Sequence, residues 1–254
     1  MNRYLEFVWH RSVAEIRADM SRAVLGIFWW IVEPVLYLAV FYVIFGLVFQ
    51  QRGENYVSFL LTGLITWKWF ASTINSSTTA ITRNMPLIYQ VYLPKVVFPL
   101  VAIVTSSFKF GIVFTMLMLF LLITGAPVTT AWLVDLPLLL IFQVLFMLGV
   151  GMTLAAIDPF LPDIKFLVDN GLLMLFFLSG IFFRFDSVPE SIRPYFDLNP
   201  MGVLIHNYRE VLLYGKHADW NSLWSTAILT LCTLLLGLFL LAKFNRKYAK
   251  RAFL

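Results

Sequence analysis

This sequence contains long apolar runs, and only a membrane could bury so many of them. Each run approaches the roughly 20 residues that an α-helix needs to cross the hydrocarbon of a bilayer. Hydrophobic residues make up 60% and charged residues 13% of the 254 positions, whereas soluble domains carry about a quarter charged residues. The runs are Val24–Phe49, Tyr56–Thr79, Val96–Thr124, Trp132–Ile157, Phe166–Phe183 and Trp220–Ala242. The sequence therefore predicts one all-α membrane domain with six transmembrane helices, of which the first five occupy residues 24–183 and the sixth residues 220–242.

The segment before the first run has the pattern of an interfacial helix. Leu5, Val8, Val13 and Ile16 recur at three- and four-residue spacing, and charged side chains lie mostly on the opposite face. An amphipathic helix of this kind lies in the membrane surface and does not cross it. We expect residues 1–22 to form this helix, and packing on a soluble partner is compatible with the same pattern.

An even number of spans places both termini on one side of the membrane. Most lysines and arginines then fall on that side, including those of the basic tail at residues 243–254. Lys and Arg are enriched in cytoplasmic loops, so both termini are predicted to be cytoplasmic. The net charge of +5 is explained by this orientation and the contact with membrane lipids, and nucleic acid is not an expected partner.

The connection at residues 184–219 is long and contains apolar pieces between Pro189, Pro194 and Pro200. Non-helical backbone enters a bilayer only where protein or a water-filled cavity satisfies its polar groups. We expect re-entrant extracytoplasmic helices here, with a flat cap on the outer surface as the alternative.

Motifs for catalysis, nucleotide binding or metal binding are missing from the sequence. Gly215-Lys216 is followed by His217 and not by Ser or Thr, so no Walker A motif is present. The three histidines are scattered, and Cys232 is the single cysteine. We predict that the chain is not an enzyme and has no cofactor or metal site of its own.

Three ionisable residues inside the predicted spans are costly in hydrocarbon and therefore informative. Glu33 lies early in the first span, and Lys68 and Lys109 lie near the middle of the second and third. They indicate either a polar pathway or a bundle interior held by ion pairs, and the sequence does not choose between these two.

Aromatic residues are patterned in the first and fifth spans. Trp30, Tyr37, Phe41 and Phe45 fall on one helical face. Phe176 and Phe183 flank the small residues of the fifth span. Flat aromatic faces suit sugar rings, but Phe is common throughout this sequence, so the pattern by itself favours ordinary helix packing, lipid contact or an interfacial belt.

Four motifs, in this order and spacing, resemble the membrane subunits of ATP-binding-cassette exporters of the polysaccharide export class. They are Ser21–Gly26 with the tryptophans and Pro34 that follow, Gly63–Phe70, Asn84–Ile88 with Leu93-Pro94-Lys95, and Leu198–Met201 with Arg209 and Gly215.

The resemblance implies a homodimer that docks two separate ATPase subunits, on which ATP and Mg²⁺ bind. It implies three sets of functional residues. The substrate path would involve Trp30, Tyr37, Phe41, Phe45, Lys68, Phe176 and Phe183. Coupling to the ATPase would involve Arg83, Asn84, Pro86, Leu87, Ile88, Tyr89 and Pro94. The outer gate would involve Asn199, Pro200 and Arg209. Lys68 departs from the family pattern, and would either contact an anionic substrate or pair with a carboxylate such as Glu33.

The implied function is export of a lipid-linked glycan, of O-antigen, capsular or teichoic acid type, across the bacterial cytoplasmic (inner) membrane. A drug or small-lipid exporter of the same architecture is the nearest alternative. An ion-coupled carrier would use Glu33, Lys68, Lys109 and Asp135 as coupling charges. A membrane enzyme acting on lipid-linked sugars would need carboxylate or histidine clusters, for which the sequence gives no convincing candidate.

Overall fold

The computed structural model describes residues 2–22, 26–41, 43–44, 55–91, 93–184 and 198–250, together with positions 189, 191 and 196. Helix makes up 81% of the structure, and the described residues contain no strand. The prediction of an all-α protein is confirmed for this part of the chain. The helices are α1 (Asn2–Arg22), α2 (Trp29–Phe41), α3 (Tyr56–Thr78), α4 (Ala80–Arg83), α5 (Met85–Gln90), α6 (Val97–Ile123), α7 (Thr130–Ile157), α8 (Ile164–Leu178), α10 (Pro200–Leu212) and α11 (Trp224–Lys250).

Four helices are long and apolar enough to cross a membrane: Tyr56–Thr78, Val97–Ile123, Thr130–Ile157 and Trp224–Asn245. They correspond to the predicted second, third, fourth and sixth spans. The other two predicted spans contain shorter helices, since α2 has 13 residues and α8 has 15. Much of the first run beyond Phe41 lies outside the described residues.

Two predicted boundaries differ from the structure. The fifth run was expected to be helical up to Phe183, but α8 ends at Leu178, where Gly180 adopts a φ of 66° that favours glycine. The predicted tail at residues 243–254 is not separate from the sixth span, because α11 continues to Lys250. Tyr248 anchors this extension by donating a hydrogen bond to the carbonyl of Ala156, 3.0 Å away.

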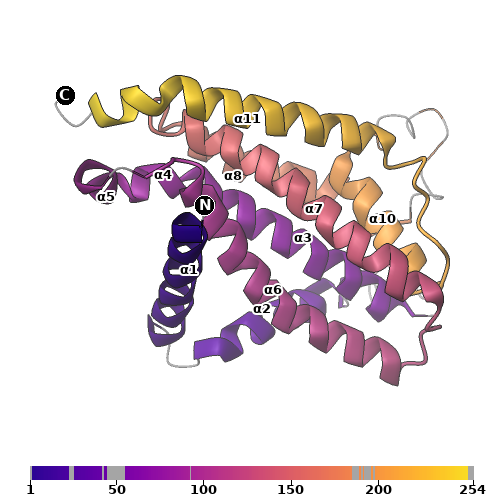
Figure 1. The fold of residues 1–254 in the computed structure, drawn as a ribbon. Helices are drawn as coiled ribbons and strands as arrows, with labels where there is room; N and C mark the ends of the chain where they lie inside the picture. Colours follow the sequence, from indigo (N-terminus) through magenta and orange to yellow (C-terminus); the bar gives the residue numbers. More distant parts are fainter. Residues whose placement is uncertain are drawn as a thin grey trace.

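The long helices lie side by side in one bundle (Figure 1). Glycines let α7 approach its neighbours closely: a Cβ added at Gly149 would lie 2.7 Å from the backbone nitrogen of Leu234 in α11. A Cβ at Gly151 would lie 2.9 Å from that of Ser77 in α3. Small residues at such positions allow membrane helices to pack backbone to backbone, which explains why α7 contacts both α3 and α11.

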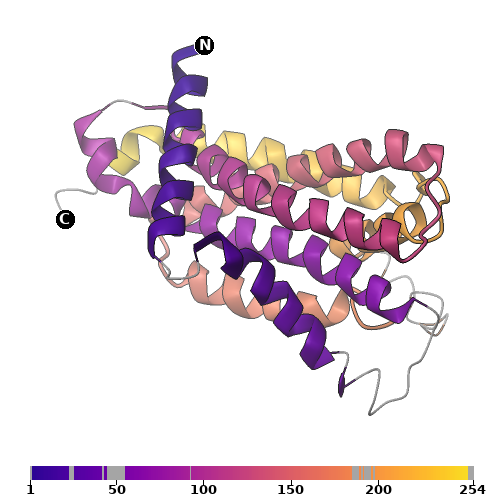
Figure 2. The same cartoon turned by 90° about the horizontal axis from the view of Figure 1, so that it is seen from below.

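Helix α1 crosses one end of the bundle and packs on α6 (Figures 1 and 2). Val8 is buried against Val97 and Val101, whereas Leu5 and Trp9 are each 61% exposed. Some apolar side chains of α1 therefore pack on the bundle, and others are exposed on its surface. Helices α4 and α5 and the described end of α11 lie at the same end of the bundle as α1 (Figure 1).

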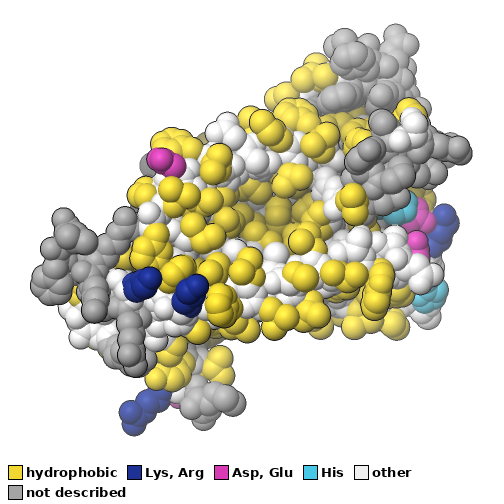
Figure 3. Space-filling model, turned by 90° about the horizontal axis from the view of Figure 1, so that it is seen from above, with side chains coloured by type: hydrophobic (Ala, Val, Ile, Leu, Met, Phe, Trp, Pro, Cys, Tyr) yellow, Lys and Arg dark blue, Asp and Glu magenta, His cyan; other side chains and the backbone are white. Residues whose placement is uncertain are grey.

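The surface between the two ends is apolar. In Figure 3 hydrophobic side chains cover the middle of the molecule, and charged side chains gather toward its ends. Exposed residues such as Leu133, Leu235 and Phe239 give the bundle a surface suited to contact with lipid acyl chains.

Candidate functional site

A groove runs along α3 and is formed by three cavities that share lining residues. The first, of about 440 Å³, lies between α2, α3 and α8. The second, of about 190 Å³, shares Lys68 and Ser72 with it and extends to α6. The third, of about 390 Å³, shares Ser106 and Lys109 with the second and reaches α1 and the α4–α5 turn. We call these three adjoining cavities together the α3 groove, and Figure 2 shows α2 and α8 beside α3.

The widest cavity of the α3 groove has an aromatic wall. Tyr37, Trp67 and Phe176 line it, and the ring centroids of Trp67 and Phe176 are 5.9 Å apart. The Lys68 ammonium lies 4.7 Å from the centroid of the Tyr37 ring. The structure therefore brings together three of the predicted path residues, Tyr37, Lys68 and Phe176, from three different helices.

The other predicted path residues are distributed differently. Trp30 lines the second cavity. Phe41 belongs to the backbone of α2, but its side chain and the whole of Phe45 lie outside the described residues. Phe183 does not line the groove, and its ring packs against that of Phe196 at 5.6 Å. The turn at Gly180 explains this departure, because it directs the chain away from the axis of α8.

The lysines inside the predicted spans both line the α3 groove and form ion pairs. Lys68 pairs with Glu33 of α2. Lys109 Nζ lies 2.5 Å from an oxygen of Asp19 of α1, and 5.5 Å from the Trp30 ring centroid. The two interpretations left open by the sequence, a polar pathway and ion pairs, therefore describe the same residues.

The predicted gate residues join α10 to the turn after α8. The Asn199 side chain caps α10 by accepting hydrogen bonds from the backbone of Met201 and Gly202. Its amide donates to the Leu178 carbonyl and the Ser179 hydroxyl, both at 3.1 Å. Pro200 occupies the first turn of α10, where its missing N–H carries no penalty.

Arg209 is 3% exposed and satisfies its guanidinium with backbone carbonyls. It donates to Gly180 at 2.7 Å, to Ile181 at 2.9 Å and to Phe59 at 3.1 and 3.2 Å. The guanidinium carbon lies 3.4 Å from the centroid of the Phe59 ring. Asn199 and Arg209 together fasten α10 to both α3 and α8.

The predicted coupling segment folds into α4 and α5 at the end of the bundle near α1. Arg83 donates to the Ser76 carbonyl at 3.0 Å, and Asn84 accepts from Arg11 of α1 at 3.2 Å. Ile88 is buried in the core of its own chain, and Leu87 packs against that core. Pro86 and Tyr89 are exposed and Pro94 is half-buried. The side chains that α5 exposes are thus the ones near Ile88, and not Ile88 itself.

A hydrogen bond joins this segment to α7. The hydroxyl of Thr82 donates to Asp158 at 2.5 Å. Burial raises the pKa of Asp158 above its usual value, while the Thr82 hydrogen bond and the charge of Lys165 act in the lowering direction.

Comparison with known proteins identifies the family. Residues 8–213 match the family described as ABC-2 type transporter. The chain belongs to the ABC-2 type transporter family.

The O-antigen export system permease protein RfbA of Klebsiella pneumoniae is 28% identical over 201 residues, which cover 79% of this chain and 78% of that protein. RfbA of Myxococcus xanthus is 28% identical over 222 residues, covering 87% and 85%. The polysialic acid transport protein KpsM of Escherichia coli is 27% identical over 226 residues, covering 88% of each. With its long apolar helices, this ABC-2 transporter subunit is a multi-pass membrane protein.

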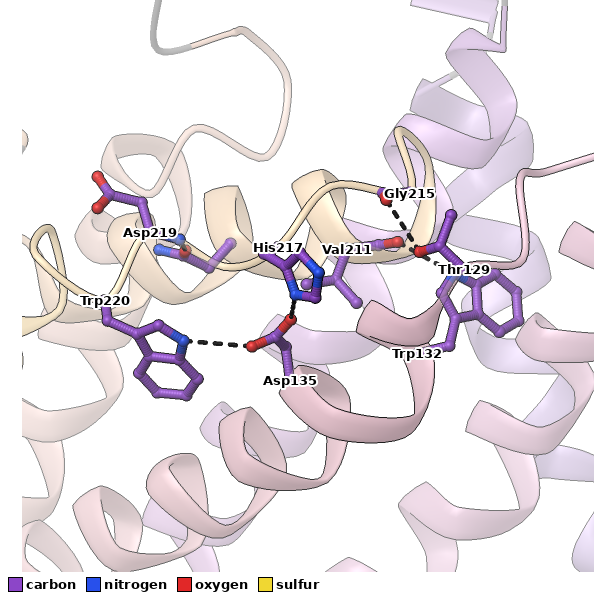
Figure 4. A network of polar contacts seen from close by, with 9 residues as sticks. Thr129, Trp132, Asp135, Val211, Gly215, His217, Asp219 and Trp220 are labelled. Atoms are coloured by element: carbon purple, nitrogen blue, oxygen red, sulfur yellow. Dashed lines mark hydrogen bonds and ion pairs between the residues drawn. The ribbon is translucent and has the colours of Figure 1, made fainter.

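The end of this ABC-2 subunit opposite α4 and α5 carries a polar network that sequence reasoning did not assemble (Figure 4). Asp135 is 3% exposed and lies 2.6 Å from a ring nitrogen of His217 and 3.2 Å from the Trp220 indole nitrogen. Trp132 and Thr129 add hydrogen bonds to the carbonyls of Val211 and Gly215. These contacts hold the connection from α10 to α11 against the start of α7. Asp135 was weighed as a coupling charge, and no sequence spacing indicated its partners 82 and 85 positions away.

Proposed function

We propose that this chain is the transmembrane subunit of an ATP-driven exporter that moves a lipid-linked polysaccharide, of O-antigen or capsular type, across the inner membrane of a bacterium. The observation that carries the proposal is the match to three relatives over most of both chains, each named for export of O-antigen or polysialic acid. The aromatic and cationic lining of the α3 groove supports it, because such a surface suits sugar rings and an attached anion.

The proposed topology has six spans, cytoplasmic termini and a re-entrant segment at residues 184–219. In this arrangement α2 and α8 belong to the first and fifth spans. Support for the orientation comes from the common end of the bundle at which α1, α4, α5 and the basic part of α11 lie. Support for the re-entrant segment comes from α10, which is largely buried and packs on α3 and α7.

The proposed assembly is a homodimer with two ATP-binding-cassette subunits, which bind ATP and Mg²⁺. In a single chain the α3 groove is open to the surface, and a second copy facing α2 and α8 would enclose it. The ATPase would contact α1, α4 and α5, where Arg11 and Asn84 already join α1 to the α4–α5 turn.

Two measurements in the native host test this proposal together. Deleting the gene should abolish surface polysaccharide, and a plasmid copy of the chain should restore it. The tagged chain, isolated gently from membranes, should bring a stoichiometric ATPase subunit with vanadate-sensitive activity. Intact surface polysaccharide in the deletion strain, combined with lost drug export, would favour the small-molecule exporter. Transport that needs an ion gradient and no ATPase would favour the ion-coupled carrier.

A further inference from the structure

We propose that Lys68 and Lys109 form a binding site for a phosphate-type anion in the narrow part of the α3 groove. The proposed anion is the phosphate or diphosphate that links a glycan to its lipid. The identity of the ligand therefore rests on the proposed function. The site itself rests on the geometry of four helices.

The cavity of about 190 Å³ concentrates hydrogen-bond donors suited to phosphate. Both lysines line it, together with the hydroxyl residues Ser72 and Ser106, the indole of Trp30 and one carboxylate, that of Glu33. Ammonium and hydroxyl groups can all donate to phosphate oxygens, and donors that carry charge form the stronger hydrogen bonds. The volume accommodates a phosphate or diphosphate group but not a sugar chain, which fits the wider aromatic cavity of about 440 Å³ beside it.

Packing between α3 and α6 sets the two lysines on the same side of the bundle. Trp69 and Phe110, each next to one lysine in the sequence, stack with their ring centroids 3.9 Å apart. Trp69 also donates to the hydroxyl of Ser107 on α6 at 3.3 Å. The stack and the hydrogen bond fix the register of α3 against α6, and therefore the relative position of Lys68 and Lys109.

In this structure each of the two lysines forms an ion pair with a carboxylate. Glu33 of α2 pairs with Lys68, and Asp19 of α1 pairs with Lys109. The four side chains are 31% to 51% exposed and line the second and third cavities, so the pairs are open to a ligand in the groove. A doubly charged phosphate that reaches both lysines can therefore replace the carboxylates.

The exchange has a structural consequence. Each carboxylate belongs to a helix that borders the groove, and each lysine belongs to a long helix of the bundle. Binding of the anion would break the ion pair between α2 and α3 and the ion pair between α1 and α6. Occupation of the groove would in this way be communicated to α1, which also contacts the α4–α5 turn through Arg11.

The test uses the purified full chain in lipid nanodiscs, with a short prenyl diphosphate as probe, the matching prenol as uncharged control, and inorganic pyrophosphate as competitor. Lys68→Gln and Lys109→Gln should each weaken binding of the diphosphate by roughly tenfold or more, as expected for a lost charge-assisted hydrogen bond. Glu33→Gln and Asp19→Asn should tighten binding, because each removes a competing anion. Lys216→Gln removes a cation that pairs with Glu210 outside the groove, and should leave binding unchanged.

The lysine variants are expected to weaken diphosphate binding and the carboxylate variants to tighten it. This difference in direction distinguishes an anion site from ion pairs that are purely structural. If the pairs only hold the helices together, lysine and carboxylate variants will change binding in the same direction, and the proposal is wrong. Prenol that binds as tightly as its diphosphate would also overturn it. Competition by inorganic pyrophosphate would show that the phosphate alone is recognised, and charge-dependent binding of the prenyl form alone would assign the site to a lipid-linked phosphate.

Failure of the site and failure of the proposed function are distinguishable. Lysine-dependent binding combined with normal surface polysaccharide in the deletion strain leaves the anion site in place and overturns the export function. Loss of surface polysaccharide in the deletion strain, combined with binding that ignores both lysines, overturns the site alone.

Discussion

Arg209 is a buried cation that is stabilised by carbonyl groups from two other parts of the chain. Its hydrogen bonds reach Phe59 of α3 and the Gly180-Ile181 turn after α8. A buried charge is tolerated only when its hydrogen bonds are made. The fork of a guanidinium can serve several carbonyls at once, which a lysine ammonium on a flexible stem does less well. Arg209, which the sequence analysis predicts to be a gate residue, therefore anchors α10 to α3 and to the turn after α8.

Gly63 gives this arrangement a sharp test. A Cβ at Gly63 would lie 2.6 Å from an η nitrogen of Arg209, so Gly63→Ala should displace the guanidinium and break one or two of its hydrogen bonds. We expect a loss of about 1.5–3 kcal/mol for each broken hydrogen bond, seen as a lower melting temperature in detergent. Gly111→Ala is the matched control, because nothing lies within 4 Å of the added Cβ on α6. Equal melting of the two variants would contradict the role of Arg209.

At the scale of the element, α5 has one face in the core and one face in solvent. Ile88 is 5% exposed within a cluster that includes residues of α4, α7 and α11. Tyr89 is 45% and Val91 48% exposed at the end of the same helix. A short helix with this division suits a groove on a soluble partner, with the buried face holding it to the bundle.

The exposed face of α5 yields a prediction about the ATPase. Replacing Tyr89 and Val91 by Asp should reduce co-purification of the ATPase subunit by roughly tenfold or more, because central apolar contacts dominate most interfaces. The yield and melting temperature of the membrane subunit should stay unchanged. Val128→Asp adds a charge at an exposed position at the other end of the bundle and serves as control. ATPase recovery that is unchanged in the double variant would place the coupling contact elsewhere.

At the scale of the whole molecule, the α3 groove links the region of proposed ATPase contact to the proposed substrate path. It begins beside α1 and the α4–α5 turn, passes the two lysines and widens between α2, α3 and α8. The cavity beside α1 and the aromatic cavity are therefore linked by the middle cavity, which α2, α3 and α6 line.

The aromatic wall of the groove can be tested in the living cell. Combining Tyr37→Ala with Phe176→Ala removes two rings that line the cavity of about 440 Å³. We expect surface polysaccharide to fall several-fold, since contacts of an aromatic ring contribute of order 1 kcal/mol each. The complex with the ATPase should still assemble. Phe239→Ala removes an exposed ring of α11 that does not line the groove, and it should leave export unchanged. Full export by the double variant would exclude this wall from the path.

Much of the fold follows from local sequence. The apolar runs that became α3, α6, α7 and α11 are long enough to decide their own structure, because a backbone in hydrocarbon must satisfy its hydrogen bonds within the helix. Helix α1 was predictable for another local reason, the three- and four-residue spacing of its apolar side chains. The helix ends were less predictable: the turn at Gly180 and the extension of α11 to Lys250 depend on contacts with α10 and with Ala156, which lie far away in the sequence.

The candidate site, too, was predictable only in part from the sequence. The sequence by itself determined the apolar helices, the family and the unusual residues, because length, hydropathy and rare charges in a span are local properties. Only the tertiary structure decided which partners these residues have: Lys68 with Glu33, Lys109 with Asp19, and Asp135 with His217. Trp67, which lies next to Lys68 in the sequence, lines the aromatic cavity beside Phe176, and only the structure shows this. The physical reason is that ion pairs and ring contacts depend on how helices pack and in which register, and that register is set by residues far apart in the sequence, such as Lys109 and Asp19, 90 positions apart.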